Sequence, residues 1–256
     1  MRRNACGAAV VGKWMDDREN PNSGNRALAW GVHLFTATGA VLAVLALAAV
    51  EAGRWHEALA WLFAALVVDG VDGSMARAAR TKELAARVSG DTLDLVIDYL
   101  TYVFVPAMFL WRAGLVPQSL GMPLAGLIVL SSLYVFARSD MKTDDGYFRG
   151  FPALWNIVAL YLFVTQPGPW VGAAVVVALA AMTFAPVHFV HPFRVRDYGV
   201  WLPQLAVLWA ITTVVLLVPG IGEPVRGWLL ACSTASAVLL VLLGLVRSVR
   251  GKRAQA

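Results

Sequence analysis

Residues 58–77 read ALAWLFAALVVDGVDGSMAR, and residues 90–98 read GDTLDLVID. An apolar run of helical length therefore leads directly into carboxylates, and a second set of carboxylates opens the next apolar run. Ionised side chains beside a lipid bilayer are costly and usually serve a function. The two stretches together indicate a membrane fold and the place of its chemistry.

The composition of the whole chain fits a protein built in the membrane. Of its 256 residues, 59% are hydrophobic and only 14% are charged. Because a span needs about 20 apolar residues, we expect an all-α, polytopic integral membrane helical bundle with about eight transmembrane helices. The candidate spans are 27–50, 55–75, 91–111, 119–138, 151–166, 169–187, 198–218 and 227–246. The fifth and sixth are short and joined by a Gln-Pro-Gly-Pro turn, so one helical hairpin is the alternative to two spans.

Basic residues predict the orientation of these spans. With eight spans, 18 of the 21 lysines and arginines fall on the side of the two termini, and the exceptions are Arg54, Arg112 and Arg226. The positive-inside rule therefore predicts that both termini are cytosolic and that the acidic stretches lie at the cytosolic face. The net charge of +5 requires no nucleic-acid partner, because basic loops beside anionic lipid headgroups explain it.

The chain is expected to form one membrane domain with short ends. We assign 1–26 to a cytosolic segment with a candidate interfacial helix, 27–247 to the membrane domain and 248–256 to a basic cytosolic tail. Cys6 and Cys232 support neither a disulfide framework nor a metal-binding pattern.

Two stripes of carboxylates are predicted to face each other. Asp69 and Asp72 are three residues apart on one helix face, and Asp91, Asp94 and Asp98 form a second stripe at the start of the next span. Facing carboxylates cannot all stay ionised without cations, and oxygen ligands select Mg²⁺ or Mn²⁺. Asp91 has a second interpretation, because it follows Gly90 where an N-cap would stand.

The residues around the first stripe indicate the kind of ligand. Gly70 and Gly73 let a ligand approach the backbone closely, and Arg77 offers a fork of donors to a phosphate. Together with metal-binding carboxylates, these residues indicate a phosphorylated substrate that bears a nucleotide.

The pattern Asp-x2-Asp-Gly-x2-Ala-Arg … Gly-x3-Asp-x3-Asp resembles the signature of the CDP-alcohol phosphotransferases. Its positions here are Asp69, Asp72, Gly73, Ala76, Arg77, Gly90, Asp94 and Asp98. Between the arginine and the second glycine lie twelve residues, where that family usually has eight or nine. The longer linker, Gly70, and eight rather than six spans resemble one branch, the bacterial phosphatidylcholine synthases. Parts of three further segments look like that branch: 33–37, 141–156 and 191–196.

The resemblance implies a phosphotransferase that moves the phosphatidyl group from CDP-diacylglycerol to choline, with CMP as the second product. It implies two Mn²⁺ or Mg²⁺ ions, and it implies that Asp98 takes the proton from the choline hydroxyl. The location implied is the bacterial inner membrane, among membrane lipids, with the active site facing the cytosol. The metal ligands would be Asp69, Asp72, Asp94 and Asp98, and the nucleotide would lie against Gly70, Gly73, Ala76 and Arg77, with Thr36 as a further candidate.

Candidate residues for binding choline and lipid phosphate rest on weaker sequence signals. Choline recognition calls for aromatic faces, and Tyr102 and Trp155 rank first, although packing is the commoner role of such residues. Arg194 and Arg196 are candidates for contact with a lipid phosphate. A zinc site is not expected at His188 and His191, because no third His or Cys lies nearby.

Alternative functions stay open. Another CDP-alcohol phosphotransferase would use serine, inositol phosphate or glycerol phosphate, and a phosphorylated acceptor would want a basic pocket, for which Arg138 and Lys142 are available. A membrane prenyltransferase should carry a second Asp-rich motif, which this sequence lacks. A carboxylate-lined cation transporter would show ion flux without CMP release. A homodimer is compatible with the sequence.

Overall fold

The computed structural model describes residues 23–251, so the expected cytosolic segment up to residue 22 and the last five residues of the tail lie outside it. The helices are α2 (Ser23–Glu51), α3 (Trp55–Ala78), α4 (Thr81–Leu84), α5 (Gly90–Asp98), α6 (Val105–Arg112), α7 (Gly121–Ala137), α8 (Trp155–Thr165), α9 (Pro169–Met182), α10 (Trp201–Leu216) and α11 (Glu223–Arg250). A π-helical segment, η1 (Tyr99–Phe104), joins α5 to α6, and a 3₁₀ turn, η2 (Gln118–Leu120), precedes α7. Two short strands, β1 (Phe148–Arg149) and β2 (His188–Phe189), form an antiparallel ribbon.

The expected helical membrane bundle is confirmed. Five helical stretches are long and apolar enough to cross a membrane: α2, α3, Gly90–Arg112, Gln118–Ala137 and α11. The helices α8, α9 and α10 are apolar but have only 11, 14 and 16 residues. At 1.5 Å per residue they reach about 16 to 24 Å, short of a ~30 Å hydrocarbon core. The count of eight spans and the cytosolic side of the termini therefore stay predictions.

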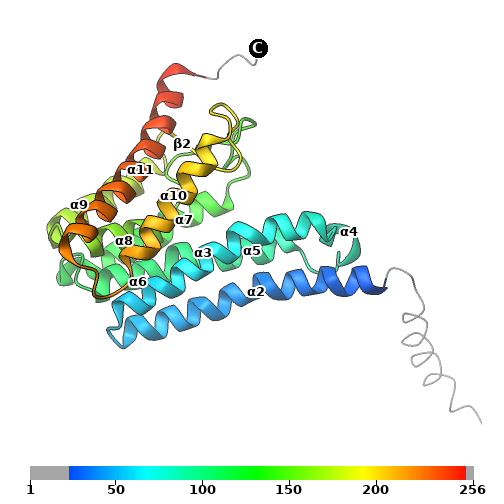
Figure 1. The fold of residues 1–256 in the computed structure, drawn as a ribbon, viewed down its shortest axis with the longest axis horizontal. Helices are drawn as coiled ribbons and strands as arrows, with labels where there is room; N and C mark the ends of the chain where they lie inside the picture. Colours follow the sequence, from blue (N-terminus) through cyan, green and yellow to red (C-terminus); the bar gives the residue numbers. More distant parts are fainter. Residues whose placement is uncertain (1–22, 252–256) are drawn as a thin grey trace, which may run out of the picture.

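The helices α2 and α3 form a long antiparallel pair, with α5 packed alongside, and the later helices cover one half of this pair (Figure 1). The close approach of α2 has a cause in its sequence. Ala43, Ala46 and Ala49 recur on one face and are buried together with Leu59 and Leu62 of α3. Small side chains at such spacing let two helix backbones pack tightly in a membrane.

The π-helical segment lies in the middle of the third long stretch, directly after Asp98. Pro106 has no N–H and cannot donate to the carbonyl four residues back. The N–H of Val105 instead bonds to the carbonyl of Leu100, five residues earlier. Such a widened turn rotates the residues that follow it, and π-segments are frequent at functional sites.

The segment between α7 and α8 folds against the later helices through the ribbon. Phe148 pairs with Phe189, and Lys142 forms a further antiparallel bridge with Phe148. Gly150 has φ +78°, and a Cβ there would lie 2.2 Å from the Thr183 carbonyl oxygen, so only glycine fits. The ribbon is therefore held close to the end of α9.

Candidate active site

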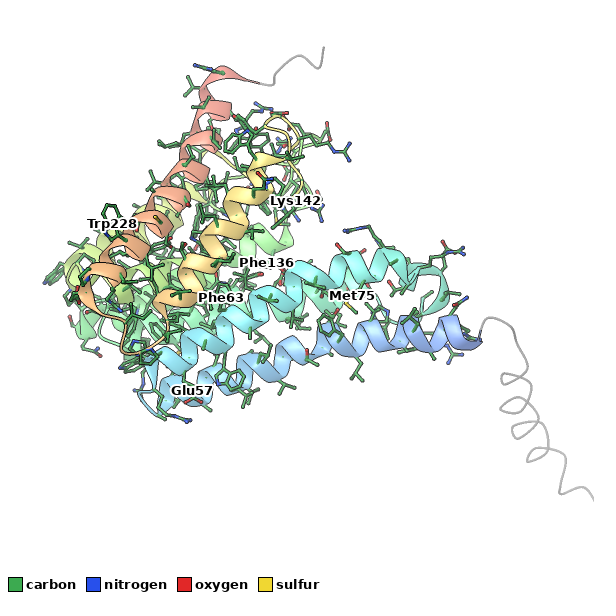
Figure 2. The ribbon with its side chains drawn as sticks, in the orientation of Figure 1. Glu57, Phe63, Met75, Phe136, Lys142 and Trp228 are labelled. Carbon is green, nitrogen blue, oxygen red and sulfur yellow. The ribbon has the colours of Figure 1, made fainter. Side chains whose placement is uncertain are left out.

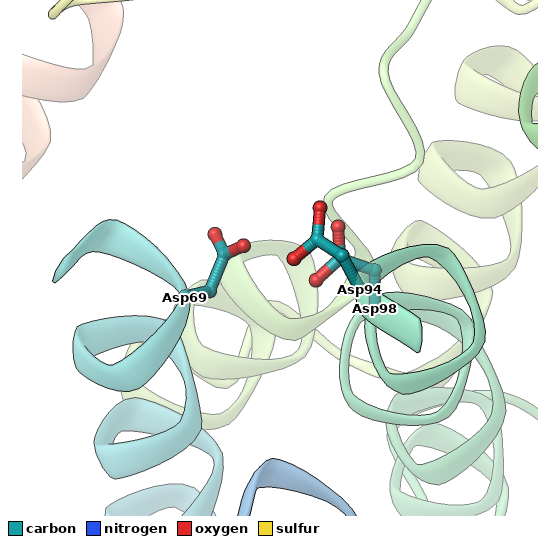
Figure 3. A group of neighbouring side chains, drawn as sticks. All are labelled: Asp69, Asp94 and Asp98. Carbon is teal, nitrogen blue, oxygen red and sulfur yellow. The ribbon is translucent and has the colours of Figure 1, made fainter. Parts of the chain in front are cut away.

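Three carboxylates from two helices meet at one point. Asp69 of α3 points toward Asp94 and Asp98 of α5 (Figure 3), and one oxygen from each lies within 4.8 Å of the others. All three side chains are half-buried. We call these residues the carboxylate cluster. The predicted meeting of the two acidic stripes is confirmed for these three residues.

Local structure explains how the cluster is held. Ser89 caps α5, because its hydroxyl accepts the N–H of Thr92 at 3.2 Å, and α5 then places Asp94 and Asp98 one turn apart on the same face. Tyr102, one further turn along, donates its hydroxyl hydrogen to Asp69 at 2.6 Å. The two helices are thus linked at the cluster itself by a hydrogen bond.

The cluster fits a divalent cation. Ligand oxygens around a six-coordinate ion with bonds of about 2.1 Å stand roughly 3 to 4 Å apart. The three carboxylate oxygens lie within 4.8 Å of one another, which is slightly wider than this spacing. A small movement of the side chains would bring all three oxygens to one ion. Three negative charges at this distance repel one another strongly, and a bound cation would remove that repulsion.

Asp72 lies on α3 one turn beyond Asp69 and stands apart from the cluster. It is only 5% exposed, and its carboxylate lies close to the side chain of Thr36 on α2. Both residues are therefore at the junction of α2 and α3. The assignment of Asp72 as a metal ligand stays a prediction.

Asp91 is not the N-cap of α5, so that interpretation was wrong. The helix begins two residues earlier than the interpretation required, and Ser89 holds the cap position. Asp91 instead lies in the first turn and forms an exposed ion pair with Lys82, at 2.8 Å. It faces solvent rather than the cluster.

The candidate nucleotide contacts lie on the part of α3 that follows Asp69. Gly70 is exposed with open space around it, and Ala76 is half-buried. The guanidinium of Arg77 turns back along the helix, bonds to Ser74 at 3.0 Å, and comes within 3.6 Å of the place where Gly73 would carry a Cβ. Gly73 therefore leaves room for the arginine fork beside the backbone.

His33, which like Thr36 was a candidate to reach the nucleotide from the first span, is a buried polar residue. Its side chain is 7% exposed, and Nε2 is buried without a hydrogen-bond partner among the described residues. The ring lies against Gly90, where a Cβ would come within 3.1 Å of it. His33 and Thr36 thus line the same side of α2, next to the second glycine and the second aspartate of the motif.

Comparison with known proteins assigns the chain to a family. Over 194 residues it is 46% identical to a phosphatidylcholine synthase of Pseudomonas aeruginosa, covering 76% of this chain and 82% of that protein. The chain belongs to the phosphatidylcholine synthase family. It is also 44% identical over 184 residues to the phosphatidylcholine synthase of Mesorhizobium japonicum (72% and 69% covered) and 32% identical over 173 residues to that of Borreliella burgdorferi (68% and 74% covered). No family model matches the chain.

Membership in the phosphatidylcholine synthase family makes the chain a multi-pass membrane enzyme of phospholipid synthesis. The two candidate choline aromatics then differ in setting. Trp155 is completely buried and donates its N–H to Ser132 at 2.9 Å, so it packs in the core. Tyr102 is 6% exposed, but its hydroxyl reaches the carboxylate cluster.

The basic residues between α7 and the ribbon also differ in setting. Arg138 is bound in two places by Asp140, at 2.7 and 2.9 Å, so its guanidinium is already occupied. Lys142 is half-buried, with Nζ 5.1 Å from the ring centroid of Phe148. Burial lowers the pKa of Lys142, the charge of Arg194 lowers it further, and the carboxylate cluster opposes both effects. Lys142 is therefore near enough to act electrostatically on the cluster.

His191 and Arg194 interact electrostatically with Lys142. Burial, together with Lys142 and Arg194, lowers the pKa of His191 to about 4, so its ring is neutral at physiological pH. The ring of His191 stacks on Phe148 at 5.3 Å. Arg194 and Arg196 are both exposed, as contacts with lipid phosphates require.

Proposed function

We propose that this enzyme transfers the phosphatidyl group of CDP-diacylglycerol to choline, giving phosphatidylcholine and CMP. The observation that carries the proposal is the meeting of Asp69, Asp94 and Asp98 at the end of an apolar helix pair, in a chain related to phosphatidylcholine synthases. We place the enzyme in the bacterial inner membrane with this cluster facing the cytosol, as the distribution of basic residues predicts.

Asp69, Asp72, Asp94 and Asp98 would hold two Mn²⁺ or Mg²⁺ ions. Such ions, when bound, neutralise the charge of the diphosphate and stabilise the departing phosphate of CMP. The half-buried setting of the cluster strengthens electrostatic interactions relative to water.

Asp98 would act as the general base. It lies deepest along α5, and within residues 23–251 no hydrogen-bond donor occupies its carboxylate. In the proposed step, Asp98 takes the proton of the choline hydroxyl while the choline oxygen bonds to the phosphorus that bears diacylglycerol. The bond from that phosphorus to the bridging oxygen breaks, and CMP leaves with that oxygen. General-base assistance of this kind is worth about 10²–10⁴-fold in rate.

The nucleotide would lie along the end of α3 beyond the cluster. Gly70 and Gly73 would allow it to approach the backbone, next to Ala76, and Arg77 would bind a phosphate with its guanidinium fork. Thr36 of α2 would be a further contact of the nucleotide. The support for this arrangement is the open space at Gly70 and the position of Arg77 beside Gly73.

The lipid part of the substrate has a matching surface on α3. A small apolar hollow of about 20 Å³ is lined by Leu59, Leu62, Phe63 and Leu66 of α3 and by Asn156, Ile157, Leu160 and Trp209. The four α3 residues continue the face that carries Asp69, because their spacing follows the helical repeat. An acyl chain would lie along this apolar face of α3 and extend from the cluster toward the membrane centre, and Arg194 and Arg196 would contact lipid phosphates at the surface.

Choline is the acceptor of the proposed reaction, in keeping with the name of the relatives. Of the two cations that could serve a phosphorylated acceptor, Arg138 is occupied by Asp140, and Lys142 is not occupied in this way within the described part of the chain. Tyr102 lies beside the cluster whereas Trp155 is completely buried. We therefore favour Tyr102 as the aromatic neighbour of the choline ammonium.

An acceptor panel tests the proposal. The purified full-length protein in lipid nanodiscs is given CDP-diacylglycerol, Mn²⁺ and labelled choline, serine, inositol phosphate or glycerol phosphate in turn. We expect labelled phospholipid and CMP in equal amounts with choline alone. Product from another acceptor would assign the chain a different activity, and ion flux without CMP release would make it a transporter.

A further inference from the structure

The ribbon beside the carboxylate cluster carries a lysine that the proposed reaction leaves unused. Lys142 follows α7 and is bridged to Phe148 of β1. Figure 2 shows Lys142 in the region of the loops and ribbon, above α3. Its charge interacts with Arg194 and with all three members of the cluster. Lys142 is therefore within electrostatic reach of the carboxylate cluster.

The ammonium group of Lys142 has no strong partner of its own. Among residues 23–251 it forms no hydrogen bond and no ion pair, and it lies 5.1 Å from the centroid of the Phe148 ring. An ammonium has three N–H donors. Removing such a group partly from water without giving it acceptors is unfavourable, so the arrangement suits an anionic ligand.

The loop that carries Lys142 and the adjoining ribbon are held by contacts with α11. Asp145 accepts a hydrogen bond from Arg247 of α11 at 3.0 Å, and the two side chains are only 8% and 11% exposed. The N–H of His188 in β2 donates to Ser248 of α11 at 2.6 Å. The loop and the ribbon are thus attached to the last helix, and Lys142 is not at the tip of a loose segment.

We propose that Lys142 binds the diphosphate of the nucleotide-lipid substrate, on the side opposite to the carboxylate cluster. This rests on the proposed function. Carboxylates repel a phosphate, so the cluster must act on it through cations, while an ammonium binds phosphate oxygens directly. Choline is not a ligand for this lysine, because its own positive charge would be repelled by Lys142 and Arg194.

Binding of CDP and of cytidine separates the diphosphate from the rest of the nucleotide. Both affinities are measured at saturating Mn²⁺ for the wild-type protein in nanodiscs and for the neutral variants Lys142→Met and Lys142→Gln. The loss of one charge-assisted interaction predicts CDP binding weaker by about 10- to 100-fold, with cytidine binding changed less than about twofold. Lys142→Arg keeps the charge and should retain most of the CDP affinity.

Arg149→Met is the matched control, because Arg149 is an exposed cation on the same ribbon whose ion-pair distance to Asp140 is 3.9 Å. It should leave CDP affinity within about twofold. Turnover adds a second measurement: in the neutral variants kcat/KM for CDP-diacylglycerol should fall while KM for choline stays nearly constant. Unchanged CDP binding in either folded neutral variant overturns the proposal, as does an effect on choline KM alone. A wild-type protein that binds CDP but does not use choline would overturn the proposed function and leave this inference standing.

Discussion

At the scale of single residues, Asp98 gives the sharpest test of the reaction. Asp98→Asn keeps the size of the side chain but cannot take the choline proton. We expect kcat to fall by about 10²–10⁴-fold, with a much smaller change in the affinity for CDP at saturating Mn²⁺. If affinity and rate fell together, Asp98 would be chiefly a binding residue.

Two neighbouring aspartates on α5 should respond very differently to the same substitution. Asp91→Asn removes only an exposed ion pair with Lys82, which is worth at most about 1 kcal/mol, so activity should stay within about threefold. Asp94→Asn removes a charged member of the carboxylate cluster and should abolish turnover. Steady-state turnover of the two variants is compared with that of the wild-type protein. Equal losses of activity would show that Asp91 belongs to the active site.

Tyr102 is expected to position Asp69. Tyr102→Phe deletes only the hydrogen bond to the carboxylate. The loss of such a supporting contact typically weakens metal binding by about 10- to 100-fold, so activation should need more Mn²⁺ and recover at saturation. Tyr99→Phe is the matched control, because the Tyr99 hydroxyl donates to the Val129 carbonyl. A Mn²⁺ activation curve unchanged by Tyr102→Phe would contradict this role.

Residue spacing predicted part of this site and left part of it hidden. Intervals of three and four residues identify a helix face, which is how Asp69, Asp94 and Asp98 could be placed together. These intervals do not reveal where a helix starts. The N-cap of α5 is Ser89 and not Asp91. Nor do they reveal that Lys142, more than forty residues beyond Asp98 in the sequence, folds back toward the cluster.

At the scale of elements, the buried ion pair between the 138–150 loop and α11 should be needed for stability. Asp145→Asn leaves Arg247 with a buried, uncompensated charge, and breaking such a pair costs about 3 kcal/mol or more. We expect a lower midpoint of thermal unfolding and lower kcat/KM for CDP-diacylglycerol. The exchange of both residues, Asp145→Arg with Arg247→Asp, should recover part of both losses. No recovery would mean that the pair does not act as a unit.

The pH dependence of this contact follows from its pKa. Burial raises the pKa of Asp145, but hydrogen bonds from Thr143 and Arg247 outweigh that effect and hold it below the usual value. A lowered pKa contributes stability above the unfolded value, near pH 4, and this contribution is lost as pH falls through the folded pKa. Thermal unfolding should show the Asp145→Asn difference undiminished from pH 6 to 8 and shrinking only in acid.

The boundaries of the helices show what hydropathy can and cannot predict. All eight predicted apolar stretches contain helices, because apolar runs between turn residues favour them. The fifth stretch was expected from residue 151, yet α8 starts at Trp155. Gly150 and Ala153 have positive φ, and Pro152 disfavours a helical conformation at Phe151. Gly150 also packs closely against Thr183. Because these two residues are far apart in the sequence, local hydropathy cannot predict this contact.

At the scale of the whole molecule, the structure combines two surfaces that a lipid-modifying enzyme needs. The carboxylate cluster lies at one end of the apolar face of α3 that includes Leu59 and Leu66. A substrate with a charged head and apolar chains can therefore reach the cluster while its chains stay in the bilayer. We propose that the metal-dependent transfer takes place at this boundary.

Removal and return of the metal ion test whether transfer depends on it. Purified protein in liposomes receives CDP-diacylglycerol and labelled choline in excess EDTA, and Mn²⁺ is then added beyond the chelator. We predict no phosphatidylcholine and no CMP before the addition, equal amounts of both after it, and neither at any stage for Asp94→Asn. Full turnover in EDTA, or turnover by Asp94→Asn after Mn²⁺ is added, would contradict the account.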